Sequence, residues 1–587
     1  MFISNIKKLI VASGMLAAQL GHTADTDPSR VIVFGDSLSD GGFYSAILPY
    51  PAGQSFTTNP DPVAPEVFAA QLGLPLAPVY GEGGTNFAIG GARVTLPNAI
   101  AVPITSQIDG FIANGGQFGD NDVVYIQGGG NDVFAFAAGG GVDPTIVSTA
   151  AVELADQVAR LQDAGAKRIV TLAIQSGGAA VFQGFNQVYK DRLVANQVNA
   201  LFFDTDALFN ELVIDAAAFG YTNILDPACG AVDSLDCGPA DYVTPDANET
   251  HIQADDVHPA GKTQRIQGQA IASLMISPEQ IGQLSYAAQS LFQSQSQLNR
   301  SQIRRASYRS AQDTAVFINV GNHQFDNGNT LQVTSLEEDS VLLSAGVDYL
   351  LAADTHAGVA IGLSDGDGEF TNNRGDYNVD SFSTMFYVNG RNNNLALGAE
   401  LLYGVANYED LTRSVQLGPV IRQHVGDTEA SVFGLSAHAG YELGLGSTWF
   451  FVPRIGLDFQ SIDIDGYSES DSLSTGATFG SQKLKSLNVQ LGMSVQALFT
   501  DSFQLYADLQ LNNELKDDER RISVTPNGAP ISYRSALYIA DDQYLTAEFG
   551  GAFSLGKSIA LNAGVRSVSG RDDTSATLYF VGAEYNF

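Results

Sequence analysis

A chain of 587 residues exceeds the size of one ordinary domain, so we expect at least two. Its hydrophobic content of 44% is typical of globular proteins and excludes wholesale disorder. The formal net charge of −35 argues against nucleic-acid binding, because the phosphates would be repelled.

Residues 1–24 have the pattern of a secretory signal peptide. Lys7 and Lys8 precede an apolar run over residues 9–20, and small and polar residues follow it. This run is too short to cross a membrane as a stable helix. We therefore expect export of the chain, with cleavage near Ala24. No later run of about eighteen apolar residues occurs, so we expect no transmembrane helix.

Residues 25–276 alternate between strand-like and helix-like segments. The strand-like segments are residues 31–34, 123–127 and 169–174, and the helix-like segments are residues 150–163, 185–212 and 259–274. Short apolar strands that alternate with helices form a parallel sheet with helices on both faces. We therefore predict a three-layer, doubly wound α/β domain.

A Gly-Asp-Ser turn at residues 35–37 directly follows the first of these strands. Open α/β sheets bind ligands in the crevice beyond the carboxyl ends of their strands, where Ser37 would lie. A serine in this place is either a nucleophile or the cap of a turn that begins a helix. The turn by itself leaves both interpretations open.

A serine nucleophile needs a base and a carboxylate that orients the base. Residues 25–276 contain two histidines, His251 and His258. Asp255 lies three residues before His258 and can fold back to hold its imidazole in one tautomer. No carboxylate has this spacing from His251, so we interpret His251 as an ordinary loop residue and His258 as the candidate base.

Two glycine-rich segments can supply hydrogen-bond donors for an oxyanion. Gly90 and Gly91 have no side chain, so a backbone N–H there can approach a substrate oxygen closely. Residues 128–132 follow the strand predicted at residues 123–127, and Asn131 in this segment offers an amide donor. Together with the serine and the histidine, these segments place the parts of an acyl-transfer site at one edge of the sheet.

The two cysteines of the chain are Cys229 and Cys237. In an exported protein their spacing suits a small loop closed by a disulfide, and two free thiols are the alternative. Two cysteines without clustered histidines do not make a zinc site. We expect no metal and no cofactor.

Residues 277–310 predict a polar helix that connects the two halves of the chain. Ser277 is the predicted N-cap, followed by Pro278 at the first helical position and Gln280 in a capping box. The helix is rich in Gln, Ser and Ala and ends with Arg300, Arg304, Arg305 and Arg309. A helix this polar is solvated or lies in a polar lumen. We expect it inside a barrel, with its arginines paired with inward Asp and Glu; a plain linker helix is the alternative.

Residues 311–587 alternate between apolar and polar side chains over stretches of about ten residues. Examples are residues 395–403, 487–499 and 503–511. This length and period are typical of transmembrane β-strands, whereas the strands of soluble β-sandwiches are shorter. The chain ends in an alternating row that terminates at Phe587, which resembles the C-terminal signature of bacterial outer-membrane proteins. We therefore predict a transmembrane antiparallel β-barrel of about 12 strands.

Four motifs occur in order in the first half of the chain: FGDSLSD, NFAIGGA, GGGND and DDVHP. They resemble the four sequence blocks of the GDSL family of lipases and esterases, also called SGNH hydrolases. The resemblance covers about residues 30–275 and implies a flavodoxin-like α/β fold. It also implies that Ser37 is the nucleophile, His258 the base and Asp255 its carboxylate. The implied oxyanion hole consists of the N–H groups of Ser37 and Gly91 and the side chain of Asn131.

With its signal peptide and barrel, the whole chain resembles an autotransporter esterase of the Gram-negative outer membrane. The resemblance implies a passenger at residues 25–276 that hydrolyses carboxylic esters at the cell surface through an acyl-enzyme, and a barrel at residues 311–587 that anchors it. The alternatives are a catalytically silent adhesin or interaction module on the same fold, and a phospholipase or polysaccharide O-deacetylase. The expected partners are an ester or lipid substrate, outer-membrane lipid and the barrel-assembly machinery. We expect a monomer.

Overall fold

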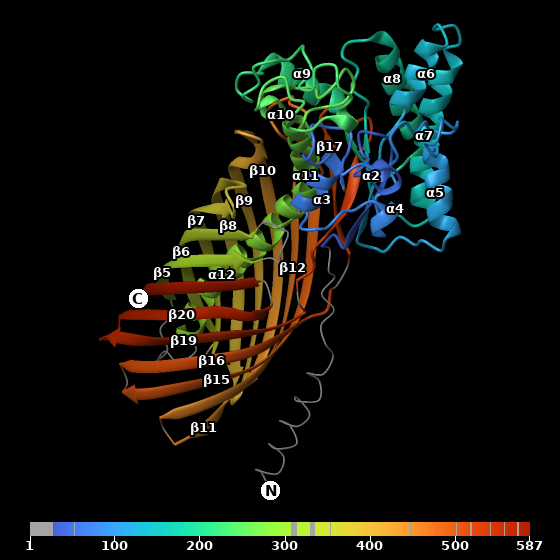
Figure 1. The fold of residues 1–587 in the computed structure, drawn as a ribbon. Helices are drawn as coiled ribbons and strands as arrows, with labels where there is room; N and C mark the ends of the chain where they lie inside the picture. The colour runs from blue at the N-terminus through green and yellow to red at the C-terminus, as the bar shows by residue number, and fades with distance from the viewer. Residues whose placement is uncertain are drawn as a thin grey trace.

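In the computed structural model the chain forms an α/β domain and a β-barrel, joined by two consecutive helices (Figure 1). The structure describes residues 27–51, 53–306, 314–328, 335–352, 354–446, 448–500, 502–516, 519–540, 542–556, 558–571 and 574–587, with backbone alone for residues 301–306. The predicted signal peptide at residues 1–24 lies outside these ranges. Among the described helices, none has the length and hydropathy needed to cross a membrane.

A parallel sheet with strand order β1-β2-β3-β4 forms the centre of the α/β domain. Its strands are β1 (Arg30–Phe34), β2 (Asp122–Ile126), β3 (Arg168–Leu172) and β4 (Leu201–Phe203). The helices of this domain are α2 (Phe43–Ile47), α3 (Ala64–Gln71), α4 (Val79–Glu82), α5 (Ile104–Ala113), α6 (Gly130–Ala138), α7 (Thr145–Asp163), α8 (Ala180–Asn196), α9 (Thr205–Ile214), α10 (Ala247–Thr250) and α11 (Gly261–Gly282). A short 3-10 helix, η1, spans Ser234–Asp236.

The two faces of the sheet pack into two separate hydrophobic cores. Val31 and Val33 of β1 cluster with residues of α3, α9 and α11. Ile32 and Phe34 cluster with residues of α5, α7 and α8. Successive side chains of a strand point to opposite faces, so both faces of this strand are covered by helices. The predicted three-layer α/β fold is confirmed.

The single helix predicted at residues 185–212 is wrong, because α8, β4 and α9 occupy this range. Gln197 has a φ of 53°, in the left-handed region that ends helices, and it caps α8. Asp204 caps the start of α9 by accepting a hydrogen bond from the N–H of Ala207 at 3.1 Å. The three β4 residues between these caps are fully buried. Tertiary packing selects a strand in an apolar segment whose pattern also suits a helix.

The capping box predicted at Ser277 is also wrong, because α11 runs through this position without a break. Pro278 has no N–H to donate to the carbonyl of Leu274, four residues earlier. The hydroxyl of Ser277 donates to that oxygen instead, at 2.9 Å. This bond replaces the missing donor, so α11 continues to Gly282, and α12 (Leu284–Ala306) begins two residues later.

Twelve strands close into the predicted antiparallel barrel, and the pairing of β10 with β12 completes the ring. They are β5 (Thr314–Asn327), β6 (Leu336–Ala352), β7 (Thr355–Phe370), β8 (Gly375–Asn392), β9 (Leu395–Leu417), β10 (Val420–Tyr441), β12 (Trp449–Ile464), β15 (Gln482–Thr500), β16 (Phe503–Glu514), β19 (Gln543–Leu555), β20 (Ile559–Arg571) and β21 (Thr574–Asn586). The short β11 (Leu443–Leu445) extends the sheet beside β12. In β15, for example, Leu491 and Met493 are exposed on the outside, whereas Asn488 and Ser494 are buried. This alternation gives the barrel an apolar outer wall and a polar lumen.

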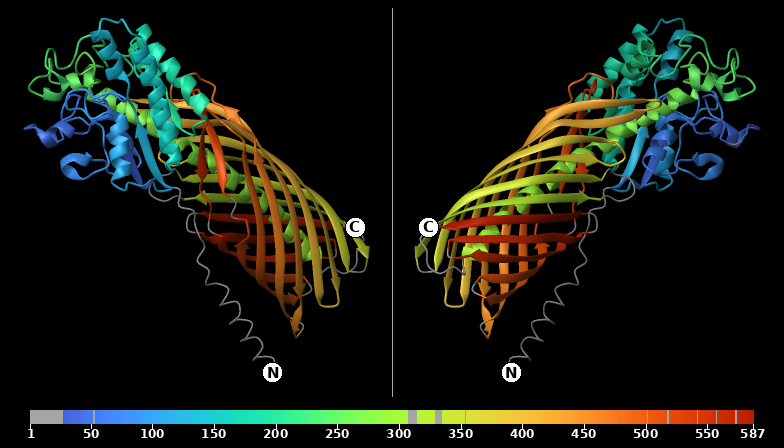
Figure 2. Two further views of the ribbon diagram at one scale, coloured as in Figure 1. Left: turned by 90° about the vertical axis from the view of Figure 1, so that its right-hand side faces the viewer. Right: turned by 90° about the vertical axis from the view of Figure 1, so that its left-hand side faces the viewer.

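The polar helix α12 lies inside the barrel (Figures 1 and 2) and contacts strands around most of the ring. The side chain of Gln295 donates to the hydroxyl of Ser381 at 2.7 Å. Arg300 forms ion pairs with Glu400 at 2.7 Å and Asp458 at 3.2 Å. A polar helix is therefore stable here because the inward side chains of the strands satisfy its polar groups. The other arginines predicted to do the same, Arg304, Arg305 and Arg309, have side chains outside the described part of the chain.

A second small sheet, which we call the docking sheet, consists of β13 (Tyr467–Ser468), β14 (Ala477–Phe479), β17 (Arg520–Pro526) and β18 (Tyr533–Leu537). It rises from the barrel beside the α/β domain (Figure 2). Next to β4, the side chain of Asn199 accepts from the N–H of Arg534 at 2.6 Å and donates to its carbonyl at 3.1 Å. Glu211 of α9 pairs with Arg422 at 2.7 Å and accepts from the N–H and hydroxyl of Ser474. The docking sheet and barrel strand β10 thus hold the β4 side of the α/β domain.

Candidate active site

The turn after β1 presents Ser37 at the carboxyl edge of the sheet. Gln107 of α5 fixes Gly35 at the start of this turn, since its side chain accepts from the N–H at 3.0 Å and donates to the carbonyl at 2.9 Å. The hydroxyl of Ser39 donates to Gln127, just beyond β2, at 2.8 Å. The turn is therefore fixed against both a helix and the neighbouring strand, with Ser37 between the two attachments.

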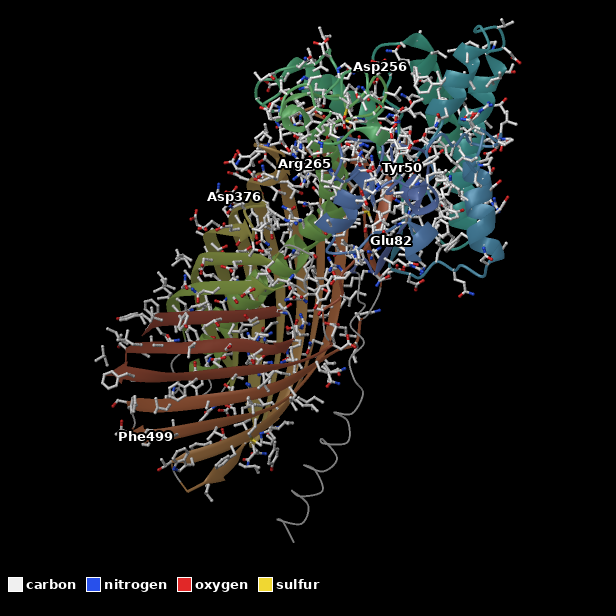
Figure 3. The ribbon with its side chains drawn as sticks, in the orientation of Figure 1. Tyr50, Glu82, Asp256, Arg265, Asp376 and Phe499 are labelled. Atoms are coloured by element: carbon white, nitrogen blue, oxygen red, sulfur yellow. A yellow bond between two sulfur atoms is a disulfide. The ribbon has the colours of Figure 1, made fainter. Side chains whose placement is uncertain are left out.

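Ser37, His258 and Asp255 form a continuous hydrogen-bonded chain. Oγ of Ser37 lies 2.8 Å from Nε2 of His258, and Nδ1 of His258 lies 2.8 and 3.0 Å from the two carboxylate oxygens of Asp255. Asp255 Oδ1 also accepts from the N–H groups of Val257 and His258, which fold the turn back. Asp256, labelled in Figure 3, lies in the exposed middle of this turn. The arrangement can transfer a proton from a serine hydroxyl to an imidazole whose tautomer is fixed.

Asp255 is the carboxylate at the end of this hydrogen-bonded series. Burial by itself would raise the pKa of its carboxyl group, but the hydrogen bond and the charge of His258, together with hydrogen bonding from Ser234, hold the pKa well below its usual range. The carboxylate is therefore ionised at neutral pH and can stabilise an imidazolium.

The segment that contains Gly90 and Gly91 lies against the end of β1. The N–H of Phe87 donates to the carbonyl of Val33 at 2.8 Å, and that of Ile89 donates to the carbonyl of Gly35 at 3.1 Å. These two backbone bonds extend the edge of the sheet past the serine turn. The segment predicted to supply an oxyanion donor therefore lies beside the turn predicted to supply the nucleophile.

The three predicted oxyanion donors occur at this same edge. Gly91 has a φ of 80°, in the left-handed region that favours glycine. Within the described part of the chain, neither the N–H of Ser37 nor that of Gly91 has a protein acceptor. Asn131, at the start of α6, donates to the carbonyl of Ala92 at 3.0 Å, so its amide adjoins Gly91. Two unpaired N–H groups and an amide beside a serine hydroxyl can bind the oxygen of a tetrahedral intermediate.

Two buried carboxylates that the sequence analysis did not single out hold these donors in place. Asp40 accepts from the N–H of Gly90 at 2.8 Å and from two N–H groups of its own turn. Asp132 pairs with Arg93 at 2.9 Å and accepts from the N–H of Val94, also at 2.9 Å. Burial raises the pKa of Asp40 to about 6. Asp40 is the last residue of the motif FGDSLSD, and Asp132 is the last residue of GGGND. Their positions in these motifs are the sequence feature from which their role could have been predicted.

The disulfide between Cys229 and Cys237 closes a loop that carries another residue of the site. Ser234 in this loop is fully buried. Its N–H donates to Oδ2 of Asp255 at 3.0 Å, and its Oγ lies 3.0 Å from Nδ1 of His258. No motif or spacing in the sequence relates Ser234 to His258, so this contact could not be predicted from the sequence.

A row of aromatic rings extends from the imidazole of His258 toward the surface. Phe56 lies 5.1 Å from the His258 ring, measured between centroids, and Tyr44 lies 5.6 Å from Phe56. Phe43 and then Tyr80 continue the row at 5.2 and 4.8 Å. The hydroxyl of Tyr44 donates to the carbonyl of Gly90 at 2.9 Å, which fixes the row beside the donor segment. One side of the site is therefore apolar.

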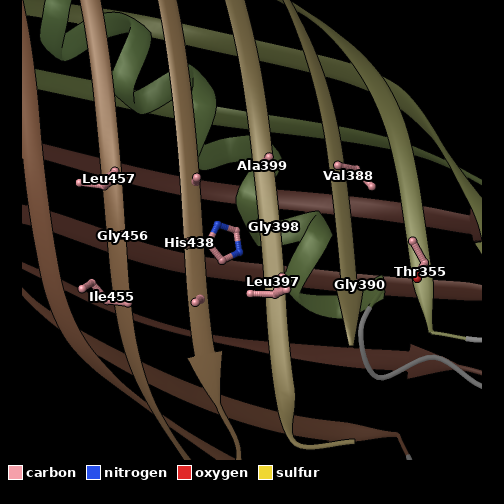
Figure 4. A pocket seen from close by; sticks show the side chains of 12 residues that line it. Thr355, Val388, Gly390, Leu397, Gly398, Ala399, His438, Ile455, Gly456 and Leu457 are labelled. Atoms are coloured by element: carbon pink, nitrogen blue, oxygen red, sulfur yellow. The ribbon is translucent and has the colours of Figure 1, made fainter. Parts of the chain in front are cut away.

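An apolar depression in the barrel wall is separate from this site (Figure 4). It is lined by residues of β7 to β10 and β12, among them Leu397, Gly398, Ala437, His438 and Ile455. Its lining is almost entirely apolar and contains none of the predicted site residues. In the part of the chain that the structure describes, no group of three or more His, Cys, Asp or Glu residues is placed to hold a metal ion.

Comparison with known proteins gives a match for each half of the chain. Residues 31–271 match the model of GDSL-like lipases/acylhydrolases, and residues 316–566 match the model of autotransporter β-domains. The chain is 26% identical to Esterase EstA of Pseudomonas aeruginosa over 98% of both chains. It is 23% identical to Lipase 1 of Photorhabdus luminescens over 90% of this chain and 92% of that one. The translocator domain of the autotransporter NalP from Neisseria meningitidis aligns at 15% identity with a TM-score of 0.42, covering 52% of this chain and 98% of that one.

The two family matches coincide with the two structural parts. The α/β domain holds the four motifs and the hydrogen-bonded serine, and the second match falls within the closed barrel. A barrel of this type is an outer-membrane anchor, so the α/β domain is exposed at the cell surface. The chain therefore combines a GDSL-like lipase/acylhydrolase domain with an autotransporter β-domain.

Proposed function

We propose that the protein is a cell-surface serine esterase that hydrolyses carboxylic esters through an acyl-enzyme. The observation that carries this proposal is the chain of hydrogen bonds from Ser37 through His258 to Asp255, beside the donors of Gly91 and Asn131. A nucleophile, a base, an orienting carboxylate and oxyanion donors are the parts that acyl transfer needs.

In the proposed reaction, Oγ of Ser37 attacks the ester carbonyl while Nε2 of His258 takes the hydroxyl proton. Asp255 keeps the proton on Nδ1 and stabilises the imidazolium. The N–H groups of Ser37 and Gly91 and the amide of Asn131 bind the oxyanion of the tetrahedral intermediate. His258 then protonates the departing alcohol, which leaves an acyl group on Ser37. A water molecule, deprotonated by His258, attacks this acyl-enzyme. His258 then returns the proton to Oγ of Ser37 as the bond to the acyl group breaks and the acid is released.

The aromatic row supports an ester with an apolar part as the substrate. Phe56 and Tyr44 are partly exposed and place apolar ring surface next to the base. The buried Phe43 connects them to the exposed Tyr80. Burial of an acyl chain on such a surface contributes about 0.8 kcal/mol for each methylene group. Phospholipids and acetylated polysaccharides contain the same ester bond, so they belong in the substrate panel.

The test is hydrolysis of p-nitrophenyl esters of short and medium chain length by intact cells. We expect Ser37→Ala to reduce the rate to that of cells without the protein. Ser176→Ala is the matched control, because Ser176 is also buried but its hydroxyl bonds to Asp206 and not to a predicted site residue. A Ser37→Ala rate equal to that of the wild type would overturn the proposal. The same pair of variants, tested on phospholipid vesicles and on acetylated polysaccharide, identifies the preferred ester.

We also propose that the barrel-assembly machinery inserts the protein as a monomer. The closed ring of twelve strands supports this proposal, because the ring itself has no open edge at which a barrel strand could pair with a second copy. Cross-linking of outer membranes should give a band of one chain, and a discrete dimer band would contradict the proposal. Depletion of the barrel-assembly machinery should reduce the amount of folded protein in the outer membrane.

A further inference from the structure

The loop between Cys229 and Cys237 lies against the Asp255–His258 pair on the side away from Ser37. Ser234 is in contact with both members of the pair, through its N–H to Asp255 Oδ2 and its Oγ near His258 Nδ1, each at 3.0 Å. Asp255 Oδ1 accepts from two N–H groups of its own turn. Apart from the His258 ring, Ser234 is the one donor to this carboxylate that the described part of the chain supplies from outside the turn.

The disulfide loop is itself fixed on two sides. The N–H of Cys229 donates to the carbonyl of Ala254, the residue before Asp255, at 2.9 Å. On the other side, the amide of Asn59 donates to the carbonyls of Ser234 at 2.9 Å and Cys237 at 3.2 Å. The disulfide joins these two attachments, and both sulfur-bearing side chains are buried with Ala254 in a small cluster of their own.

The segment that holds the loop also packs against the base. Phe56 lies three residues before Asn59, and its ring is 5.1 Å from the imidazole of His258. The imidazole is therefore confined on one side by a ring and on another by Ser234, and both depend on the same contact between residues 54–59 and the loop. A loop that moved would release both.

From these contacts we infer that Ser234 is a positioning residue for the Asp255–His258 pair and that the Cys229–Cys237 disulfide holds it in place. The inference rests on the proposed esterase activity. Ser234 does not contact Ser37 or the oxyanion donors, so it acts on the reaction through the orientation of the imidazole. Because a cysteine loop of this kind closes in an oxidising environment, the site would reach its full activity only after export.

The experiment measures kcat and KM on a p-nitrophenyl ester for four outer-membrane preparations. These are the wild type, Ser234→Ala, Cys229→Ala with Cys237→Ala, and the triple variant; alanine suits the cysteine sites because they are buried among apolar atoms. Ser234→Ala removes the contact of Oγ with His258 Nδ1 and leaves the backbone N–H bond to Asp255 in place. We expect it to lower kcat about tenfold with KM unchanged, as for a lost hydrogen bond to the imidazolium that forms during the reaction. The cysteine variant should lose at least as much. Adding Ser234→Ala to it should change kcat less than twofold, because the serine is already displaced.

Two results would overturn the inference. One is a Ser234→Ala enzyme with the kcat of the wild type, and the other is an equal loss from Ser234→Ala with and without the disulfide. If the cysteine variant does not fold, as judged by the mobility of its barrel on unheated gels, Asn59→Ala replaces it, because this change loosens the loop and leaves the disulfide intact. Ser37→Ala, measured in parallel, separates the two proposals. Wild-type activity of Ser37→Ala contradicts the esterase mechanism, whereas an inactive Ser37→Ala beside a fully active Ser234→Ala contradicts the inference about Ser234 alone.

Discussion

Asn131 is the one donor of the proposed oxyanion hole that belongs to a side chain. The other two donors are backbone N–H groups, which substitution does not remove. The Asn131 amide is already oriented by its bond to the carbonyl of Ala92, and Asp132 fixes the following turn of backbone through Arg93 and Val94. A donor held in this way needs little reorganisation when negative charge develops on the substrate, which is where such donors have their effect.

We therefore expect Asn131→Ala to lower kcat by about 10²–10³-fold, with a much smaller change in KM. Initial rates of ester hydrolysis over a range of substrate concentrations check this prediction. Asn114→Ala is the control, because Asn114 bonds only to the end of its own helix α5. An Asn131→Ala enzyme with unchanged kcat would remove Asn131 from the oxyanion hole.

Asp36 predicts a pH dependence of stability. Burial raises the pKa of this carboxyl from 3.8 to about 6, against the opposing effect of the hydrogen bond from the Leu38 N–H. Because the folded-state pKa lies above the unfolded value, Asp36 favours the folded state fully below about pH 4. This contribution is lost as the pH rises to about 6, and it amounts to about 3 kcal/mol at most.

Asp36→Asn should therefore stabilise the α/β domain by about 1–3 kcal/mol at pH 7 and leave it unchanged at pH 4. Hydrogen exchange of the β1 amides in detergent micelles measures this difference. Tryptophan fluorescence does not serve here, because the one tryptophan, Trp449, lies in the barrel. A difference from the wild type that is the same at pH 4 and pH 7 would contradict the assigned cause.

The short motifs identified Ser37, Asp255 and His258 from the sequence because these residues lie next to strand ends or within one turn. Their mutual distances depend on the fold, and the structure brings them within hydrogen-bond range. Ser234 and Phe56 could not be found in this way. Each reaches His258 through a loop whose path is set by a disulfide or by packing, and no local pattern encodes such a contact.

At the scale of elements, long periodic segments were predictable and short or continuous ones were not. The barrel strands and α7 show a clear period over ten or more residues. β4 has three residues, which is too short to show a period. The helix start predicted at Ser277 is wrong because the Ser277 hydroxyl supplies the hydrogen-bond donor that Pro278 lacks. The docking sheet left no mark in the sequence that separated it from ordinary barrel hairpins.

The contacts of Glu211 with Arg422 of β10 and with Ser474 predict a measurable coupling between α9 and the barrel. Glu211→Ala leaves the largely buried Arg422 without its carboxylate, so we expect the contact to lose about 1–3 kcal/mol. Hydrogen exchange should rise in α9 and in the loop between β13 and β14, while ester hydrolysis stays near the wild-type rate. Asp120→Ala is the control, since it breaks the exposed pair with Lys167. Equal exchange in both variants would contradict a structural role for the Glu211 contact.

At the scale of the whole molecule, a hydrophobic cluster runs without interruption from the sheet of the α/β domain, along α11 and α12, into the barrel. The chain thus has two family domains but one connected core. The acidic side chains that give the chain its formal net charge of −35 are distributed over both parts. Some of them line the lumen, where they pair with α12.

Arg300 tests how much the lumen helix stabilises the barrel. Arg300→Ala leaves the buried carboxylates of Glu400 and Asp458 without a cation, so we expect a loss of about 3–5 kcal/mol. When samples are heated to a series of temperatures before electrophoresis, the temperature at which the compact barrel band disappears should fall. Adding Glu400→Gln should recover part of the loss, and Arg521→Ala, which breaks an exposed pair with Glu519, should have no effect. An unchanged unfolding temperature for Arg300→Ala would contradict this role.

Because α11 belongs both to the core of the α/β domain and to the connection with the barrel, it limits where the α/β domain can be separated from its anchor. The helix starts three residues after His258, contributes Ile266, Ala270 and Leu274 to the core beneath the sheet, and then enters the barrel region. A fragment that ends within these residues would lose part of the core that supports the base. A water-soluble version should therefore end at or after Gly282, with the newly exposed apolar residues of the last turns of α11 replaced by polar ones.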